Sequence, residues 1–212
     1  MTEQNKILLI EDRETHLSHA RAMLDHRVAR NCILGYDFVT NLADAQKLLN
    51  EKKYGGILTD VFFPKEVGGL EEQLGTTVGE YAINNKIPYV LVTSTHHHGE
   101  KTGPVCKWAR EHGTEIVDAQ QKNNSFEGEA CEKNWKGAYM VLSYLLALKD
   151  KEVQIPEEEC MQDVIQNVFR FSESLSPNST YVNGSREEYS AYIKNQIPGI
   201  QFVLDKYCRE MF

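Results

Sequence analysis

The sequence predicts an α/β protein with a doubly wound, five-stranded parallel sheet, followed by additional C-terminal helices. Through about the first 150 residues, short apolar runs alternate with amphipathic stretches, which is the pattern of βαβ units. The apolar runs lack polar alternation, as expected for parallel strands covered on both faces. After about residue 120 the sequence shows no further strand pattern, so the rest of the chain is predicted to be helical.

Five apolar runs are the predicted strands, and a helix is expected after each. The strands are expected at residues 6–10, 36–39, 56–60, 89–93 and 115–117, and the helices at 17–28, 42–49, 76–85, 102–113 and 134–148. The segment after Asp60 holds Pro64, Gly68 and Gly69 and is predicted to be a loop. The helix at 134–148 is apolar nearly all round, which indicates burial between the sheet and a further layer.

Residues 151–212 are predicted to form a helical extension packed on a first domain at residues 1–150. Pro156 followed by three glutamates is a favourable helix start. Ser185 and Glu188 fit a capping box for a second helix, which Pro198 and Gly199 are expected to break or kink. Because the apolar helix at 134–148 needs a cover, we expect the extension to supply it rather than act as a separate effector domain.

The composition argues against several classes of partner. With a net charge of −8, a surface that tracks nucleic acid or an anionic membrane along its whole length is disfavoured. The first residues fit neither a signal peptide nor a membrane span. The five cysteines are odd in number and scattered, which favours reduced thiols and a cytoplasmic location. We therefore expect a cytoplasmic protein with neither a nucleic-acid nor a membrane partner.

Acidic and hydroxyl side chains follow three of the predicted strands. Glu11 and Asp12 follow the first strand, Asp60 ends the third, and Thr93 ends the fourth. The carboxyl ends of parallel strands meet at one edge of a sheet, where functional groups collect. Three carboxylates there would suit Mg²⁺, which prefers oxygen ligands. Asp60 would then be a nucleophile toward a phosphoryl group, and the Thr93 hydroxyl could donate a hydrogen bond to it.

Three motifs in this order resemble the receiver domains of response regulators: ILLIED at 7–12, GGILTDVFFP at 55–64 and PYVLVTS at 88–94. The resemblance covers roughly residues 5–148 and implies a flavodoxin-like fold with strand order 2-1-3-4-5. It also implies roles for particular residues. These are Asp60 as phosphoacceptor, Thr93 as switch hydroxyl, and Glu11, Asp12, Asp60 and the backbone carbonyl of Phe62 as Mg²⁺ ligands.

The same resemblance implies a function in two-component signal transduction. A histidine kinase or phosphotransfer protein would supply the phosphoryl group, and a downstream protein would read the change at the surface. We therefore expect a phosphoacceptor signalling protein rather than a turnover enzyme. A homodimer is left open. The tail lacks a recognition helix with clustered lysine and arginine, which again disfavours DNA binding.

Two departures from the family pattern keep other functions open. A lysine expected at the end of strand five falls near Gln120, where the sequence has none, and Lys122 comes two residues later. The aromatic switch position falls at Val117. One alternative is therefore a pseudo-receiver, a binding module without phosphotransfer. Another is a Mg²⁺-dependent phosphohydrolase, which is weakened because Phe62 stands where some such enzymes carry a second acid.

Other candidate features are given ordinary explanations. The triplet His96, His97 and His98, with or without Cys106, could suggest a transition-metal site, but adjacent residues on a loop point different ways. His16, His19 and His26 are predicted to share a solvated helix face. The tail tyrosines are expected to pack in the core, with an aromatic interface as the alternative.

Overall fold

The computed structural model describes residues 6–95, 100–114, 116–120, 132–155, 161–175 and 186–208. Its centre is a five-stranded sheet in which each neighbouring pair is parallel, as predicted. In spatial order the strands are β2 (Gly35–Val39), β1 (Lys6–Ile10), β3 (Gly56–Asp60), β6 (Tyr89–Val92) and β7 (Ile116–Val117). With the two small hairpins left aside, this is the order 2-1-3-4-5, so the predicted fold class is confirmed.

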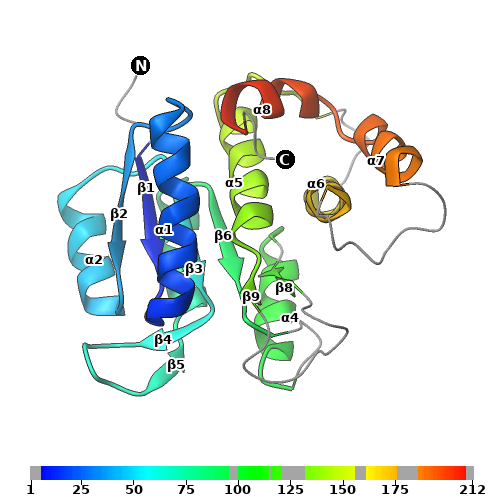
Figure 1. Ribbon diagram of the computed structural model, residues 1–212. Coiled ribbons are helices and arrows are strands. Elements are labelled where there is room, and N and C mark those ends of the chain that lie inside the picture. The colour runs from blue at the N-terminus through cyan, green and yellow to red at the C-terminus, as the bar shows by residue number, and fades with distance from the viewer. Residues whose placement is uncertain are drawn as a thin grey trace.

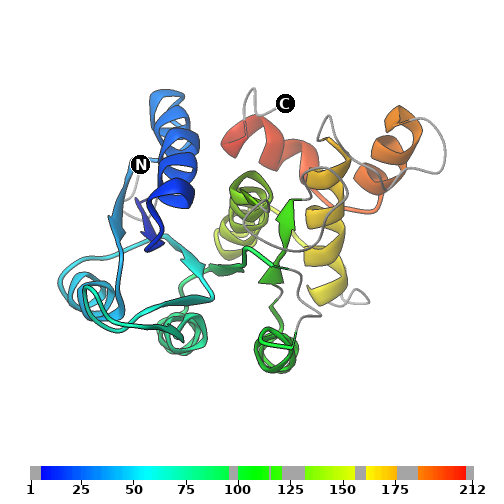
Figure 2. The ribbon, with the colours of Figure 1, turned by 60° about the horizontal axis from the view of Figure 1, so that its bottom comes forward.

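Helices cover both faces of the sheet (Figures 1 and 2). On one face lie α1 (Glu14–Ala29) and α5 (Trp135–Lys149), which share a core with Ile7, Leu9 and Leu58 of the sheet. On the other face lie α2 (Leu42–Glu51), α3 (Gly75–Asn84) and α4 (Gly103–Glu111), which pack on the alternate strand residues. Because successive side chains of a strand point to opposite faces of the sheet, each buried strand contributes residues to both hydrophobic cores.

Two short antiparallel hairpins interrupt this pattern, and neither was predicted. The segment expected to be a loop after Asp60 forms β4 (Phe62–Pro64) and β5 (Glu71–Gln73). The expectation of no strand after residue 120 is also wrong, because β8 (Ala119–Gln120) pairs with β9 (Glu132–Lys133). Strands of two or three residues are too short to give a periodic pattern. Both hairpins lie near the carboxyl ends of the strands (Figure 1).

The C-terminal helices are α6 (Met161–Ser174), α7 (Arg186–Asn195) and α8 (Ile200–Tyr207), and they share one hydrophobic core with α5. Gly199 has a φ of 69°, so the predicted break before α8 lies at a left-handed residue that glycine adopts without strain. The predicted start at Pro156 and the capping residue Ser185 lie outside the described residues. The division into two domains at residue 150 stays a prediction. No described helix is both long and apolar enough to span a membrane.

One carboxyl group makes the stability of α6 packing sensitive to pH. Burial raises the pKa of Glu173 from 4.5 to about 7, and the negative charge of Asp118 raises this pKa further, against the opposing charge of Arg170. Because the folded protein holds this proton more tightly than the unfolded chain does, protonated Glu173 contributes to stability. The contribution is complete below the unfolded pKa of 4.5 and is lost as the pH rises through the folded pKa of about 7.

We therefore expect Glu173→Gln to stabilise the protein at pH 8 by about 2 kcal/mol relative to wild type, and by much less at pH 5. Urea denaturation at both pH values measures this difference. Glu80→Gln, at an exposed position of α3, is the matched control and should change the free energy of unfolding by less than about 0.5 kcal/mol. Equal effects of Glu173→Gln at the two pH values would contradict the prediction.

Candidate functional site

Asp60 lies at the end of the central strand β3 and is 4% exposed. Its Oδ1 accepts a hydrogen bond from the backbone N–H of Val61 at 2.7 Å. Gly75, at the start of α3, packs directly against this turn, and a Cβ added there would lie 2.6 Å from the Asp60 carbonyl oxygen. The backbone around Asp60 is therefore held from two sides, with one carboxylate oxygen left for other partners.

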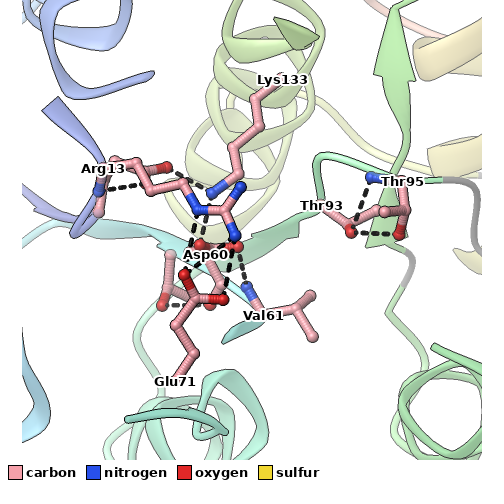
Figure 3. Close-up of polar contacts among 9 residues, drawn as sticks. Arg13, Asp60, Val61, Glu71, Thr93, Thr95 and Lys133 are labelled. Atoms are coloured by element: carbon pink, nitrogen blue, oxygen red, sulfur yellow. Dashed lines mark hydrogen bonds and ion pairs between the residues drawn. The ribbon is translucent and has the colours of Figure 1, made fainter. Parts of the chain in front are cut away.

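That second oxygen pairs with Lys133. Lys133 Nζ lies 2.5 Å from Asp60 Oδ2 and 2.5 Å from Glu11 Oε2, and the lysine side chain is 1% exposed (Figure 3). The buried ammonium thus joins carboxylates from β3 and the end of β1. No lysine stands at the end of strand five, as the sequence indicated, but the site has a cation that the sequence analysis missed, and it comes from β9.

The sequence position of Lys133 explains why counting along the chain missed it. Counting residues forward from Gly113 to find the lysine assumes a short connection between the fifth strand and α5. In the structure, β8 and β9 lengthen that connection. Counting back from the helix finds the lysine, because it directly precedes Asn134. The Asn134 side chain caps α5 by accepting a hydrogen bond from the Gly137 N–H at 2.8 Å. Lys122, the earlier candidate, lies outside the described residues.

Glu11 and Asp12 complete an acidic cluster with Asp60. One carboxylate oxygen from each residue lies within 4.8 Å of the other two. Glu11 is fully buried, and its Oε1 accepts a hydrogen bond from the Arg13 N–H at 3.0 Å. Asp12 Oδ1 is buried and has no hydrogen-bond partner among the described residues. An unpaired buried carboxylate oxygen is costly unless a cation satisfies it, so this cluster could hold a metal ion.

The electrostatics of the cluster are dominated by burial. Burial raises the pKa of Asp60 to about 6, while the charge of Lys133 opposes this rise. Burial likewise raises the pKa of Glu11, again against Lys133. The pKa of Asp12 is raised by burial and by the negative charges of Asp60 and Glu71. The acidic cluster is thus short of positive charge, which a divalent cation would supply.

Thr93 follows β6 and is 1% exposed. Its hydroxyl is paired with the Thr95 hydroxyl at 3.1 Å and accepts a hydrogen bond from the Thr95 N–H at 3.2 Å. Figure 3 shows Thr93 and Thr95 set to one side of the group around Asp60. Val117, at the expected switch position, is buried, and Phe62 is half-buried in β4. The expected roles of Thr93 and of the Phe62 carbonyl stay predictions.

The histidines are distributed differently from the prediction. His96, His97 and His98 lie outside the described residues, so their relation to Cys106 stays open. On α1, His19 and His26 are exposed as expected, but His16 is buried. Burial, with the positive charges of Lys133 and Arg13, lowers the pKa of His16 to about 4, so this ring is neutral beside the cluster at physiological pH.

Comparison with known proteins gives little beyond the fold. No protein-family model matches the chain, and no curated protein matches it. Among solved structures, the RcsB response regulator of Salmonella typhimurium is similar with a TM-score of 0.44 and 13% sequence identity. That match covers 99% of this chain and 94% of the other.

This comparison corrects one expectation about partners. The RcsB structure is described as showing conformational dynamism for DNA interaction. The expectation that this chain has no nucleic-acid partner is therefore withdrawn. The net charge of −8 belongs to the whole chain and does not describe any one face of it.

Proposed function

We propose that this protein is a cytoplasmic signalling receiver that accepts a phosphoryl group on Asp60 in the presence of Mg²⁺. The observation that carries the proposal is the pairing of buried Lys133 with both Asp60 and Glu11. A buried ammonium between two carboxylates is positioned to bind a phosphoryl oxygen as soon as Asp60 becomes an aspartyl phosphate. The unpaired Asp12 oxygen beside it supports a metal role for the acidic cluster.

Each side chain has a role in the proposed transfer. Asp60 Oδ2 attacks the phosphorus of the donor while the bond from phosphorus to the donor atom breaks, and the donor keeps that electron pair. Lys133 then pairs with the phosphoryl oxygens, and Thr93 donates its hydroxyl to one of them after leaving Thr95. Glu11, Asp12, Asp60 and the Phe62 carbonyl would hold Mg²⁺, which supplies positive charge against the phosphoryl oxygens when bound.

The donor and the reader of the signal follow from this chemistry. A histidine kinase or a histidine phosphotransfer protein would donate the phosphoryl group, as in a two-component phosphorelay, and a downstream protein would bind the altered surface. The main support for the pseudo-receiver alternative was the absent lysine at the end of strand five, and Lys133 supplies a cation in its place. Val117 at the aromatic switch position remains as the other support for that alternative. The phosphohydrolase alternative keeps its weakness, because half-buried Phe62 stands where a second acid would be needed.

Incubation with Mg²⁺ and acetyl phosphate tests the proposal through the intact mass of the protein. We expect the mass of one phosphoryl group to be added to wild type and none to Asp60→Asn. Omitting Mg²⁺ should greatly reduce the adduct. In parallel, beryllofluoride should change the intrinsic fluorescence, because the Trp135 ring lies 5.8 Å from Lys133 Nζ.

The outcomes separate the candidate functions. If neither a phosphoryl adduct nor a Mg²⁺-dependent fluorescence change is observed, the proposal fails and the pseudo-receiver is the remaining interpretation. Steady release of phosphate from phosphate esters would favour the hydrolase. An adduct that persists in Asp60→Asn would move the acceptor to another residue.

A further inference from the structure

A second cation, Arg13, lies beside the acidic cluster, and the proposed function does not use it. Arg13 follows the acidic pair directly and precedes the first turn of α1, with extended φ and ψ of −88° and 118°. Its side chain is half-exposed and makes three hydrogen bonds of 2.9 to 3.1 Å to the carboxylate of Glu71 on β5. Figure 3 shows this pair beside Asp60 and Lys133. Arg13 thus ties the β4–β5 hairpin to the segment between the acidic pair and α1.

The electrostatic contacts of this pair reach the acidic cluster. The hydrogen bonds that Arg13 donates to Glu71 raise the pKa of Arg13, and the charges of Asp12 and Asp60 raise it further. In turn, Glu71 contributes to the raised pKa of Asp12. The guanidinium therefore interacts with the carboxylates of the site as well as with its direct partner on the hairpin.

A guanidinium fork binds a carboxylate and a phosphate with the same planar, two-pronged geometry. The Glu71 carboxylate therefore occupies the guanidinium of Arg13, and a phosphoryl group could compete with it for that guanidinium. Four carboxylates (Glu11, Asp12, Asp60 and Glu71) face two cations (Lys133 and Arg13), so a divalent ion would neutralise the group. Phosphorylation replaces one carboxylate charge with about two negative charges, so the group then carries about one negative charge more than its cations neutralise.

Resting on the proposed function, we infer that Arg13 is an exchangeable phosphoryl ligand that leaves Glu71 for the phosphoryl group on Asp60. The exchange moves the guanidinium from the partly exposed Glu71 carboxylate to the more highly charged phosphoryl group and unties the β4–β5 hairpin from the start of α1. Val67 and Leu70, which are 79% and 86% exposed, lie in the turn of this hairpin. The hairpin is therefore the part of the surface that changes for a protein partner to read.

The inference predicts opposite effects of the two halves of the pair on beryllofluoride binding in the presence of Mg²⁺. Glu71→Gln removes the competitor, so the Kd for beryllofluoride should fall about two- to fivefold, the range that an exposed ion pair supports. Arg13→Gln removes the ligand, so the Kd should rise about tenfold. Glu72→Gln is the matched control, since neighbouring side chains on a strand point to opposite faces. Its Kd should equal that of wild type.

Hydrogen exchange provides the second readout, independent of affinity. Beryllofluoride should speed amide exchange in β4 and β5 of wild type, whereas in Glu71→Gln these amides should exchange fast from the start. Effects of the same sign on Kd in both variants, or a hairpin that beryllofluoride leaves unchanged, would overturn the inference alone. No beryllofluoride response in wild type would overturn the proposed function together with the inference.

Discussion

Replacing Lys133 with methionine is expected to lower the free energy of unfolding by about 3 to 5 kcal/mol at neutral pH, and to abolish stable phosphorylation of Asp60. The lysine is 1% exposed and its ammonium contacts Asp60 and Glu11. Methionine fills a similar volume but leaves the two carboxylates buried together without their cation. Breaking a buried pair by removing one partner is far more costly than losing an exposed pair.

The loss should depend on pH and on metal. The charge of Lys133 opposes the burial that raises the pKa of both Asp60 and Glu11, so in Lys133→Met these groups hold their protons to higher pH. Lowering the pH protonates Asp60 and Glu11, which should reduce the difference in free energy of unfolding between Lys133→Met and wild type. Mg²⁺ should also restore part of the lost stability.

Urea denaturation at pH 7 and pH 5, with and without Mg²⁺, measures these effects. Lys136→Met is the matched control, because Lys136 lies one turn away on α5 and is exposed. Its stability should stay within about 0.5 kcal/mol of wild type. A Lys133→Met protein as stable as the control would mean that the pair contributes nothing to the fold.

The contrast between Asp60 and Lys133 shows which part of the site a sequence can reveal. Asp60 ends a buried strand, and strands alternating with helices fix the edge of the sheet at which it lies. Lys133 reaches the same point from a two-residue strand beyond a long connection, so its position depends on tertiary packing. Local patterns place residues of regular elements, and they do not place residues of inserted hairpins.

The same limit applies to Arg13 and Glu71, which are 58 residues apart in sequence. Arg13 looks like an ordinary surface residue at a helix start, and Glu71 was expected in a loop. Their pairing depends on the turn of the β4–β5 hairpin, whose strands are too short to show a pattern. Burial of α5, by contrast, follows from its sequence, because a helix that is apolar all round must be covered.

Truncation of the chain after Asp150 is expected to remove the ability of the remainder to fold as a stable, soluble monomer. Helix α5 is enclosed between the sheet and the C-terminal helices, and Val168 of α6 and Val203 of α8 are fully buried in the core that contains α5. The hydroxyls of Tyr139 and Tyr144 donate to the carbonyls of Tyr207 and Pro198, each at 3.0 Å. Truncation would expose these apolar and polar groups together.

Soluble yield, oligomeric state and cooperative thermal unfolding of residues 1–150 test this expectation against the full chain. Tyr144→Phe in the full chain removes one of these two hydrogen bonds and should cost only about 1 kcal/mol. Comparing this variant with the truncated chain therefore separates the effect of losing one hydrogen bond from the effect of losing the helices that cover α5. A truncated chain that is monomeric and unfolds cooperatively would show that residues 151–212 are dispensable for folding. If the extension is required for folding, α5 lies in the interior, and the proposed signal would have to use another surface, for which the edge with Asp60 and the β4–β5 hairpin is our candidate.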